Sequence, residues 1–212
     1  MARIWSGSGE PQNFRKESPI PKNLERHRRD LRQELIAAGL DILAEGGLEK
    51  LTLRRVAARV GVSHAAPAHH FNGLPHLLGC ICAVGFQNLT VAMRERRAIA
   101  SSSARAQLIA ICDAYLDYAI ENSGLMQLMF NAHPGAVDDD EVRPVAAGTY
   151  RELRDACAPF EPVGEAPDST ETMIWSLIHG LALLRIGGRF ANPSRVTNAP
   201  DFGDILPNLS LR

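Results

Sequence analysis

Four of the seven histidines lie close together in the sequence, which raises the question of whether their imidazoles bind a metal ion. They are His64, His69, His70 and His76. Metal-binding histidines on a helix are usually three or four residues apart and are joined by a third ligand. The spacings here are five, one and six, so the pattern predicts no metal site and no cofactor. Contact with phosphates or with base edges in a nucleic-acid groove is the chemistry that it favours.

Arginines surround these histidines and give this part of the chain a positive charge. Residues 51–100 contain six arginines and a single acidic residue, Glu95. Residues 1–100 carry 15 lysines and arginines against 9 acids, and the rest carries 8 against 15, so the net charge of −1 hides two oppositely charged halves. A basic half is typical of a protein that meets a polyanion, although solvated faces also segregate charge by chance. The arginines placed to neutralise phosphates are Arg28, Arg29, Arg54, Arg55 and Arg59.

The cysteine pair and the acidic run of the sequence do not have the spacing of metal sites. Cys80 and Cys82 are two residues apart on a predicted helix, so their thiols diverge and cannot share a zinc ion. The run 138–141 is acidic throughout but lacks the glycine and the alternating spacing of a calcium loop. We interpret it as the solvated start of a helix.

No catalytic motif is recognisable. The sequence has no Gly-x-Ser-x-Gly, no phosphate-binding loop and no dinucleotide fingerprint. Nucleophilic catalysis would require Cys112 or Cys157 to meet His133 or His179 across the fold. We therefore predict that the protein is not an enzyme.

The composition is that of a folded protein. Of the 212 residues, 45% are hydrophobic, which excludes intrinsic disorder of the whole chain. The first residues lack the apolar segment of a secretory signal. The stretch 173–186 is strongly apolar, but it is too short to span a membrane and is interrupted by His179 and Arg185. We expect a cytoplasmic protein without a membrane partner, whose four cysteines are reduced thiols.

Apolar residues recur with the period of a helix along most of the chain, and no alternating strand pattern accompanies them. Leu31, Leu35, Ala38 and Ile42, for example, share one helical face. The predicted fold is therefore all-α. The predicted helices span about 26–46, 52–61, 63–70, 74–98, 103–121, 124–132, 139–157 and 168–188.

Several polar residues and a glycine predict where individual helices begin and end. Thr52 and Ser63 are the predicted N-caps of the second and third helices, and Gly61 ends the second. Asp168 is predicted to open the last helix in a capping box with Glu171. The predicted organisation is a flexible arm, an N-terminal helix-turn-helix domain and a larger C-terminal domain over residues 1–25, 26–78 and 79–212.

Two short helices joined by a tight turn follow a longer helix, which is the plan of a helix-turn-helix unit over residues 52–71. A recognition helix must be slim enough to enter a DNA major groove about 12 Å wide. Apolar residues beneath it must also hold it rigidly, and Val56, Val60 and Phe71 are placed to do so.

The segment from Arg29 to Leu78 resembles the DNA-binding domain of the tetracycline-repressor (TetR) family of bacterial transcriptional regulators. The matching stretches are Leu51-Thr52-Leu53-Arg54-Arg55-Val56-Ala57, Val60-Gly61-Val62-Ser63, His70-Phe71 and Leu77-Leu78. The stretch from Trp175 to Gly180 also resembles a subgroup with a Trp-x-x-x-His-Gly signature in its C-terminal domain. The resemblance implies a homodimeric repressor that binds double-stranded operator DNA. It also implies that a small apolar or amphipathic effector enters the C-terminal domain and releases the DNA.

Candidate site residues follow for both domains. We expect base contacts from His64, Ala65, Ala68 and His69 on the recognition helix. We expect backbone-positioning contacts from Thr52, Arg54, Arg55, Ser63 and His70. Methionine and aromatic side chains adapt to apolar ligands, and the candidate effector pocket is Cys112, Tyr115, Met126, Met129, Phe130, Trp175 and His179. Plain core packing is the alternative interpretation of these seven residues.

The sequence departs from the family pattern at two positions in the DNA-binding domain. The family usually has a tyrosine where this chain has Ala68, and a lysine where it has Leu74. Losing one phosphate contact and one positive charge should weaken DNA binding and lower its salt dependence by about one charge unit. The alternative function is therefore a ligand-binding or interaction protein of the same fold with weak or lost DNA binding.

Overall fold

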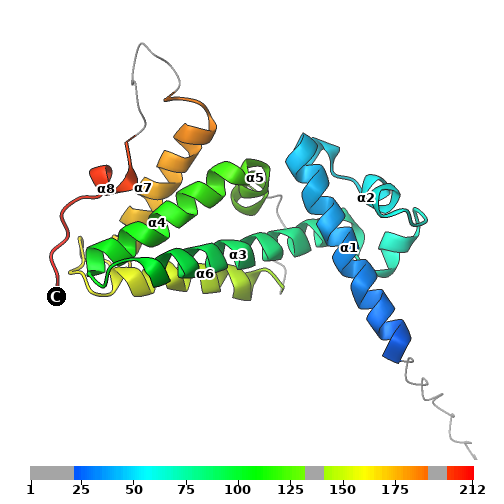
Figure 1. Cartoon of the computed structure of the whole chain (residues 1–212), viewed down its shortest axis with the longest axis horizontal. Helices are drawn as coiled ribbons and strands as arrows, with labels where there is room; N and C mark the ends of the chain where they lie inside the picture. The colour runs from blue at the N-terminus through cyan, green and yellow to red at the C-terminus, as the bar shows by residue number, and fades with distance from the viewer. Residues whose placement is uncertain (1–21, 132–140, 191–199) are drawn as a thin grey trace, which may run out of the picture.

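The computed structural model describes residues 22–131, 141–190 and 200–212, and these residues form an all-α fold, as predicted (Figure 1). Apart from one isolated bridge between Phe160 and Leu211, the described residues contain no β-structure. The helices are α1 (Lys22–Gly46), η1 (Leu48–Lys50), α2 (Leu53–Val60), η2 (Ala66–His69), α3 (Gly73–Ile99), α4 (Ala104–Glu121), α5 (Ser123–Asn131), α6 (Arg143–Cys157), α7 (Ser169–Ile186) and α8 (Phe202–Ile205).

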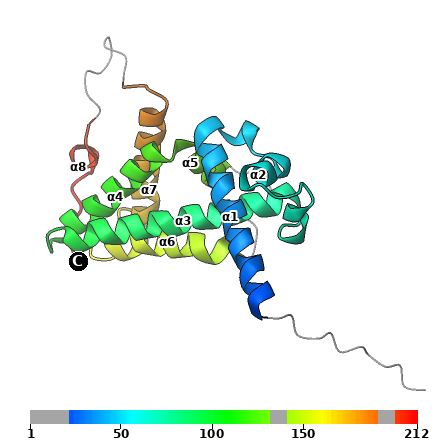
Figure 2. The same ribbon diagram turned by 45° about the vertical axis from the view of Figure 1, so that its right-hand side comes forward.

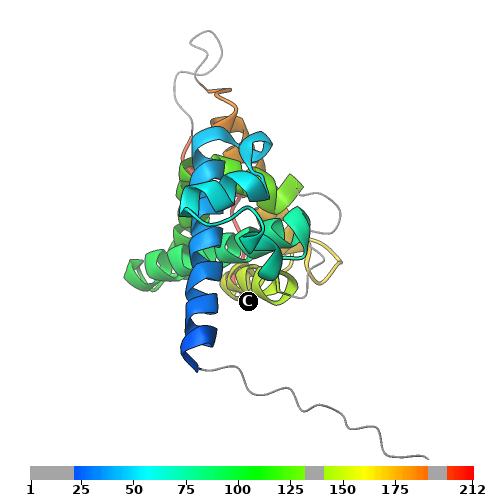
Figure 3. The same ribbon diagram turned by 90° about the vertical axis from the view of Figure 1, so that its right-hand side faces the viewer.

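The long helix α3 connects two groups of helices. The N-terminal region, which consists of α1, η1, α2 and η2, packs at its beginning, and α1 crosses it steeply (Figure 2). The remainder of α3 packs along α4 and α6, and α7 lies against α4 and α6. We call this second group, α3 to α8, the helical bundle. Seen from the N-terminal side, α1 and α2 stand in front of the bundle (Figure 3).

In the N-terminal region, α2 begins and ends as the sequence predicted, whereas α1 begins at Lys22, within the segment predicted to be a flexible arm. The Thr52 hydroxyl accepts a hydrogen bond from the Arg55 backbone N–H at 3.2 Å and so caps α2. Gly61 ends α2 with a φ of 82°, in the left-handed region that glycine adopts without a steric penalty. Val56 and Phe71 are buried beneath α2 and η2, and Val60 is half-buried.

The third predicted helix is wrong in its type and its cap. Residues 66–69 form a short 3₁₀ segment, and Ala65 stands at its N-cap position without a side-chain bond. The backbone carbonyl of Ser63, and not its hydroxyl, accepts the hydrogen bond from the Ala66 N–H at 3.0 Å. Pro67 explains the difference, because a proline disfavours the α conformation of the residue before it and supplies no N–H.

The capping box predicted at Asp168 is also wrong, since the Asp168 side chain makes no capping hydrogen bond. The next two side chains bond back to the preceding loop instead. Ser169 Oγ accepts from the Gly164 N–H at 3.0 Å, and Thr170 Oγ1 accepts from the Val163 N–H at 3.2 Å. The sequence reasoning missed α8, which does begin with a capping box. Among the features predicted earlier, residues 1–21, His133 and residues 138–140 lie outside the described residues.

α3 is long and apolar enough to span a membrane by length and composition, although the sequence analysis did not single it out. Most of its apolar stretch is buried inside the protein, against α1, α4, α5 and α6. Its apolar character therefore reflects its position at the centre of the fold.

Candidate DNA-binding surface and ligand cavity

The predicted DNA-contacting residues lie together on α2, on η2 and in the turn that joins them. All are exposed except His70, which is half-buried. The exposed ones are Thr52, Arg54, Arg55, Ser63, His64, Ala65, Ala68 and His69. Burial of Val56 and Phe71 fixes the backbone beneath this surface, so its exposed side chains are presented from a rigid base.

The arginines of α2 differ in their surroundings. Arg59 forms two hydrogen bonds with Glu45 of α1, with N–O distances of 2.6 and 2.5 Å. This pairing raises the pKa of Arg59 and lowers the pKa of Glu45. The charge of Arg59 is thus balanced within the N-terminal region, whereas Arg54 and Arg55 are exposed residues of α2. Arg29 is also exposed, and the side chain of Arg28 lies outside the described residues.

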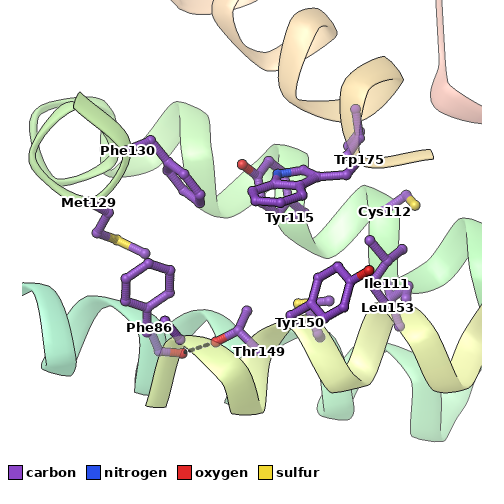
Figure 4. A pocket seen from close by; sticks show the side chains of 13 residues that line it. Phe86, Ile111, Cys112, Tyr115, Met129, Phe130, Thr149, Tyr150, Leu153 and Trp175 are labelled. Atoms are coloured by element: carbon purple, nitrogen blue, oxygen red, sulfur yellow. Dashed lines mark hydrogen bonds between the residues drawn. The ribbon is translucent and has the colours of Figure 1, made fainter. Parts of the chain in front are cut away.

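The helical bundle contains a partly open apolar cavity of about 330 Å³ (Figure 4). Five helices contribute to its wall, α3, α4, α5, α6 and α7. Five of the seven predicted pocket residues line it: Cys112, Tyr115, Met129, Phe130 and Trp175. The other lining residues are Phe86, Met93, Ile111, Ala146, Thr149, Tyr150, Leu153 and Ile178.

The two remaining predicted residues, Met126 and His179, lie beside this cavity. With Phe130, which also lines the cavity, they line a smaller space of about 30 Å³. His179 also contacts the cavity wall, because its Nδ1 atom lies 2.7 Å from the Tyr115 hydroxyl. Burial raises the pKa of Tyr115 and lowers the pKa of His179, so this hydrogen bond joins a neutral phenol to a neutral imidazole.

Two threonine hydroxyls at the cavity wall bond to each other and to the backbone of α3. The hydroxyl oxygens of Thr149 and Thr90 lie 2.7 Å apart, and they lie 3.1 and 2.8 Å from the Phe86 carbonyl oxygen, so one hydroxyl donates to the other and the second donates to the carbonyl. Burial raises the pKa of Cys112, which keeps that thiol neutral. Within residues 22–131, 141–190 and 200–212, no lysine, arginine, aspartate or glutamate lines the cavity. The cavity therefore suits a ligand without charge.

The residues that sequence reasoning missed lie mostly on α3 and α6. Thr149, Tyr150 and Leu153 of α6 face the cavity, but helical periodicity alone does not reveal which neighbouring helix a face meets. The available signal was the adjacent pair Thr149 and Tyr150, polar side chains close to the apolar side of the predicted helix.

The thiol chemistry required for an enzyme is missing from the described residues. Burial raises the pKa of Cys157 to about 12, as it raises that of Cys112. His179 is bonded to Tyr115 rather than to a cysteine. Neither thiol is therefore activated as a nucleophile.

Both parts of this arrangement match known protein families. Residues 35–73 match the model described as "Bacterial regulatory proteins, tetR family". Residues 108–201 match the model described as "Tetracyclin repressor-like, C-terminal domain". The chain belongs to the TetR family. It is therefore a DNA-binding transcriptional regulator and not an enzyme, as the sequence predicted.

Similar TetR-type proteins support this assignment along most of the chain. The HTH-type transcriptional regulator BetI of Burkholderia thailandensis is 28% identical over 181 residues, which are 82% of this chain and 92% of that protein. A BetI protein of Chromohalobacter salexigens is 33% identical over 96 residues, which are 45% and 48% of the two chains.

Solved structures share the fold as well. A protein of unknown function from Rhodococcus sp. RHA1 is 29% identical with a TM-score of 0.64, over 86% of this chain and 90% of that one. A TetR family transcription regulator from Marinobacter aquaeolei VT8 is 16% identical with a TM-score of 0.61, over 88% and 100% of the two chains. That second likeness concerns the fold alone.

Proposed function

We propose that this TetR-family protein is a cytoplasmic repressor that binds operator DNA as a homodimer and releases it when an uncharged apolar molecule fills the cavity. The observation that carries the effector part is the cavity itself, because it is large, apolar and built from five helices of the bundle. In this proposal residues 26–78 bind DNA, and residues 79–212 bind the effector and the second subunit.

The lining favours a flat, uncharged ligand. Moving a charged group out of water into an apolar site is costly unless a partner compensates it, and the described part of the wall contains no charged side chain. The rings of Phe130, Tyr150 and Trp175 are neighbours, with centroids 6.2 Å apart for Phe130 and Trp175 and 6.1 Å apart for Tyr150 and Trp175. Aromatic rings so arranged bind other rings through offset or edge contacts.

The basic, exposed surface of α2 and η2 supports the DNA-binding part. We propose that His64, Ala65, Ala68 and His69 face the bases, and that the remaining five predicted residues position the phosphate backbone. Arg54 and Arg55 supply the positive charge there, since Arg59 is paired with Glu45.

The outer face of α7 supports the homodimer. Leu183 and Leu184 are both about half exposed, at 48% and 47%, although they lie on a helix of the bundle. Gly180 lies one turn before Leu184, and nothing lies within 4 Å of the place where its Cβ would be. A small residue flanked by exposed leucines permits the close approach of a second α7.

Fluorescence anisotropy with labelled duplexes that tile the DNA around the gene tests the DNA-binding part. We expect saturable, sequence-selective binding that weakens when the salt concentration is raised. Arg55→Ala should weaken binding to all duplexes alike and lower the salt slope by about one, because it removes one phosphate contact. Arg151→Ala, which removes an exposed arginine of α6, is the matched control and should leave binding unchanged.

Equal and weak binding to every duplex would contradict this proposal. It would favour the alternative function, a ligand-binding protein of the same fold. DNA affinity would then be weak because Ala68 and Leu74 replace the tyrosine and lysine of the family pattern. Mass spectrometry of the same sample would show whether a copurified effector holds the protein off DNA, because removing it would then restore binding.

A further inference from the structure

A polar cluster outside the cavity joins the N-terminal region to the helical bundle. It consists of Arg32, His76, Cys80 and Glu141, and we call it the Arg32 cluster. The Arg32 Nη2 atom donates to both carboxylate oxygens of Glu141, at 3.0 and 2.7 Å, and lies 3.1 Å from Cys80 Sγ. Cys80 Sγ is 3.6 Å from Glu141 Oε2, and His76 Nε2 is 3.9 Å from Glu141 Oε1.

One side of the cluster touches the proposed recognition segment. Arg32 belongs to α1, and its guanidinium lies over the Phe71 ring, 5.6 Å from the ring centre. Phe71 is buried, and its N–H donates to the Pro67 carbonyl of η2 at 2.9 Å. A movement of Arg32 therefore changes the packing of Phe71, the residue that anchors η2.

The other side of the cluster leads to the cavity. Glu141 is followed by the fully buried Val142 and then by α6. Ala146, the first cavity-lining residue of α6, is only five residues after Glu141 in the sequence. Thr149 ties the same helix to α3 through its bond to the Phe86 carbonyl. A ligand that displaces α6 must therefore displace Glu141 or strain its bonds to Arg32.

The same residues suggest a metal site, because atoms of His76, Cys80 and Glu141 lie within 4.8 Å of one another. Two contacts favour Arg32 as the resident cation. Its Nη2 atom lies where an ion bound to both Cys80 Sγ and Glu141 Oε2 would lie. The Asn72 N–H donates to His76 Nδ1 at 3.0 Å, which places the ring proton on Nε2, the atom that would have to bind the metal.

We propose that the Arg32 cluster is an interdomain contact that opens when the cavity is filled and so transmits cavity occupancy to the recognition segment. The transmission rests on the proposed role of the cavity as an effector site. The claim that the Arg32–Glu141 pair holds the contact closed is independent of that role, because the pair can be tested without ligand and without DNA.

Cys80 provides a local reporter, because it is the buried member of the cluster and its thiol contacts both Arg32 and Glu141. The experiment measures the alkylation rate of each cysteine by iodoacetamide with peptide mass spectrometry, in the wild type and in Glu141→Gln. The substitution keeps the size of the side chain, but it also removes a negative charge 3.6 Å from the Cys80 thiol, which favours the reactive thiolate. The Cys80 rates are therefore compared at the plateau that each protein reaches at high pH, where the thiol is fully ionised, so a remaining increase reports opening. We expect Cys80 to react up to about fivefold faster, the largest factor expected from the loss of one partly exposed ion pair. Cys82, buried nearby on α3, should keep its rate and is the internal control.

Glu152→Gln is the matched control variant. It weakens the ion pair between Arg94 and Glu152, 2.7 Å apart, which joins α3 to α6 within the bundle. We expect no change in Cys80 labelling. An unchanged Cys80 rate in Glu141→Gln, or an equal increase in Glu152→Gln, would overturn the proposal. Protection of Cys80 by micromolar zinc chloride would also overturn it, by showing that the cluster is a metal site.

A second arm adds the uncharged fluorescent probe N-phenyl-1-naphthylamine. In a Trp5→Phe background Trp175 is the only tryptophan, so energy transfer from it reports that the probe occupies the cavity. Saturating probe should accelerate Cys80 labelling about fivefold in the wild type and add little in Glu141→Gln. Occupancy without acceleration in the wild type would overturn the transmission. Failure of the probe to bind would count against the proposed effector class, while the ligand-free comparison would still decide whether the pair closes the contact.

Discussion

The hydrogen bond between Tyr115 and His179 connects two of the residues that were predicted to line the effector pocket. Its length of 2.7 Å and its position between α4 and α7 fix both side chains at the edge of the cavity. Burial lowers the pKa of His179, so the imidazole stays neutral in the folded protein at a pH where it would be protonated in the unfolded chain.

This difference predicts a pH-dependent stability. As the pH falls through the ordinary histidine range near 6.5, the unfolded chain takes up a proton that folded His179 does not, so the free energy of unfolding decreases. Urea denaturation at pH 7.5 and 5.5 measures this decrease. The free energy of unfolding should fall less between the two pH values in His179→Gln than in the wild type. His64→Gln, at an exposed position, should retain the wild-type loss. Identical pH dependence in all three proteins would contradict the assignment.

Side-chain type alone was sufficient to select part of the cavity wall. Tyr115, Phe130 and Trp175 were predicted because large aromatic and sulfur-containing side chains suit apolar ligands, and all three line the cavity. Thr149 could not be found in this way, because its place in the wall depends on how α6 packs on α3. Its hydroxyl is satisfied by the Phe86 carbonyl, a contact between residues 63 positions apart.

At the scale of the helices, the close approach of α5 to α3 depends on Gly85. A Cβ atom at this position would lie 2.6 Å from Met129 Sδ and 3.2 Å from Leu125 Cδ1. Both of those side chains are buried, and Met129 lines the cavity. The carbonyl of Gly85 also accepts a hydrogen bond from the Tyr118 hydroxyl at 3.1 Å, which holds α4 to the same place.

Gly85→Ala should therefore destabilise the protein and narrow the cavity. Overpacking costs about 1–3 kcal/mol, and the better helix propensity of alanine returns about 1 kcal/mol, so we expect a net loss of about 1 kcal/mol. Gly148→Ala, whose new Cβ would meet only Arg151 at 3.8 Å, should gain stability instead. Urea denaturation measures the stabilities of both variants. Titration with N-phenyl-1-naphthylamine measures the probe affinity, which should fall if the cavity is narrower. A more stable Gly85→Ala protein with unchanged probe affinity would contradict this packing.

Helix ends were predictable where a local signal acted alone. Thr52 and Gly61 bound α2 as expected, because a hydroxyl cap and a left-handed glycine require only their immediate neighbours. Ser63 and Asp168 carry the same kind of signal but do not cap. Pro67 changes the backbone after Ser63, and loop residues compete for the side chains after Asp168. At both positions a second local signal a few residues away overrides the predicted cap.

For the whole molecule, the charge asymmetry of the sequence corresponds to a division of surfaces. The exposed arginines of α2 lie at one end of α3, and the exposed leucines of α7 lie on the bundle. The first surface suits DNA, and the second suits another copy of the chain.

Replacing both Leu183 and Leu184 with glutamate should convert the homodimer to a monomer, because four carboxylates would face one another across the proposed seam. Val91→Glu is the matched control, since Val91 is as exposed as the leucines, at 50%, but lies on α3. Sedimentation velocity distinguishes monomer from dimer. A dimeric double variant, or a monomeric Val91→Glu protein, would exclude α7 as the seam.

In the proposed mechanism, the cavity and the DNA-binding surface are thermodynamically linked. A reciprocal titration tests this linkage most directly. The affinity of N-phenyl-1-naphthylamine is measured with and without a saturating specific duplex, and the duplex affinity with and without saturating probe. Linkage predicts that each ligand weakens the other by the same factor, about 5- to 150-fold for typical couplings. A probe that fills the cavity while the duplex affinity stays unchanged would contradict the account.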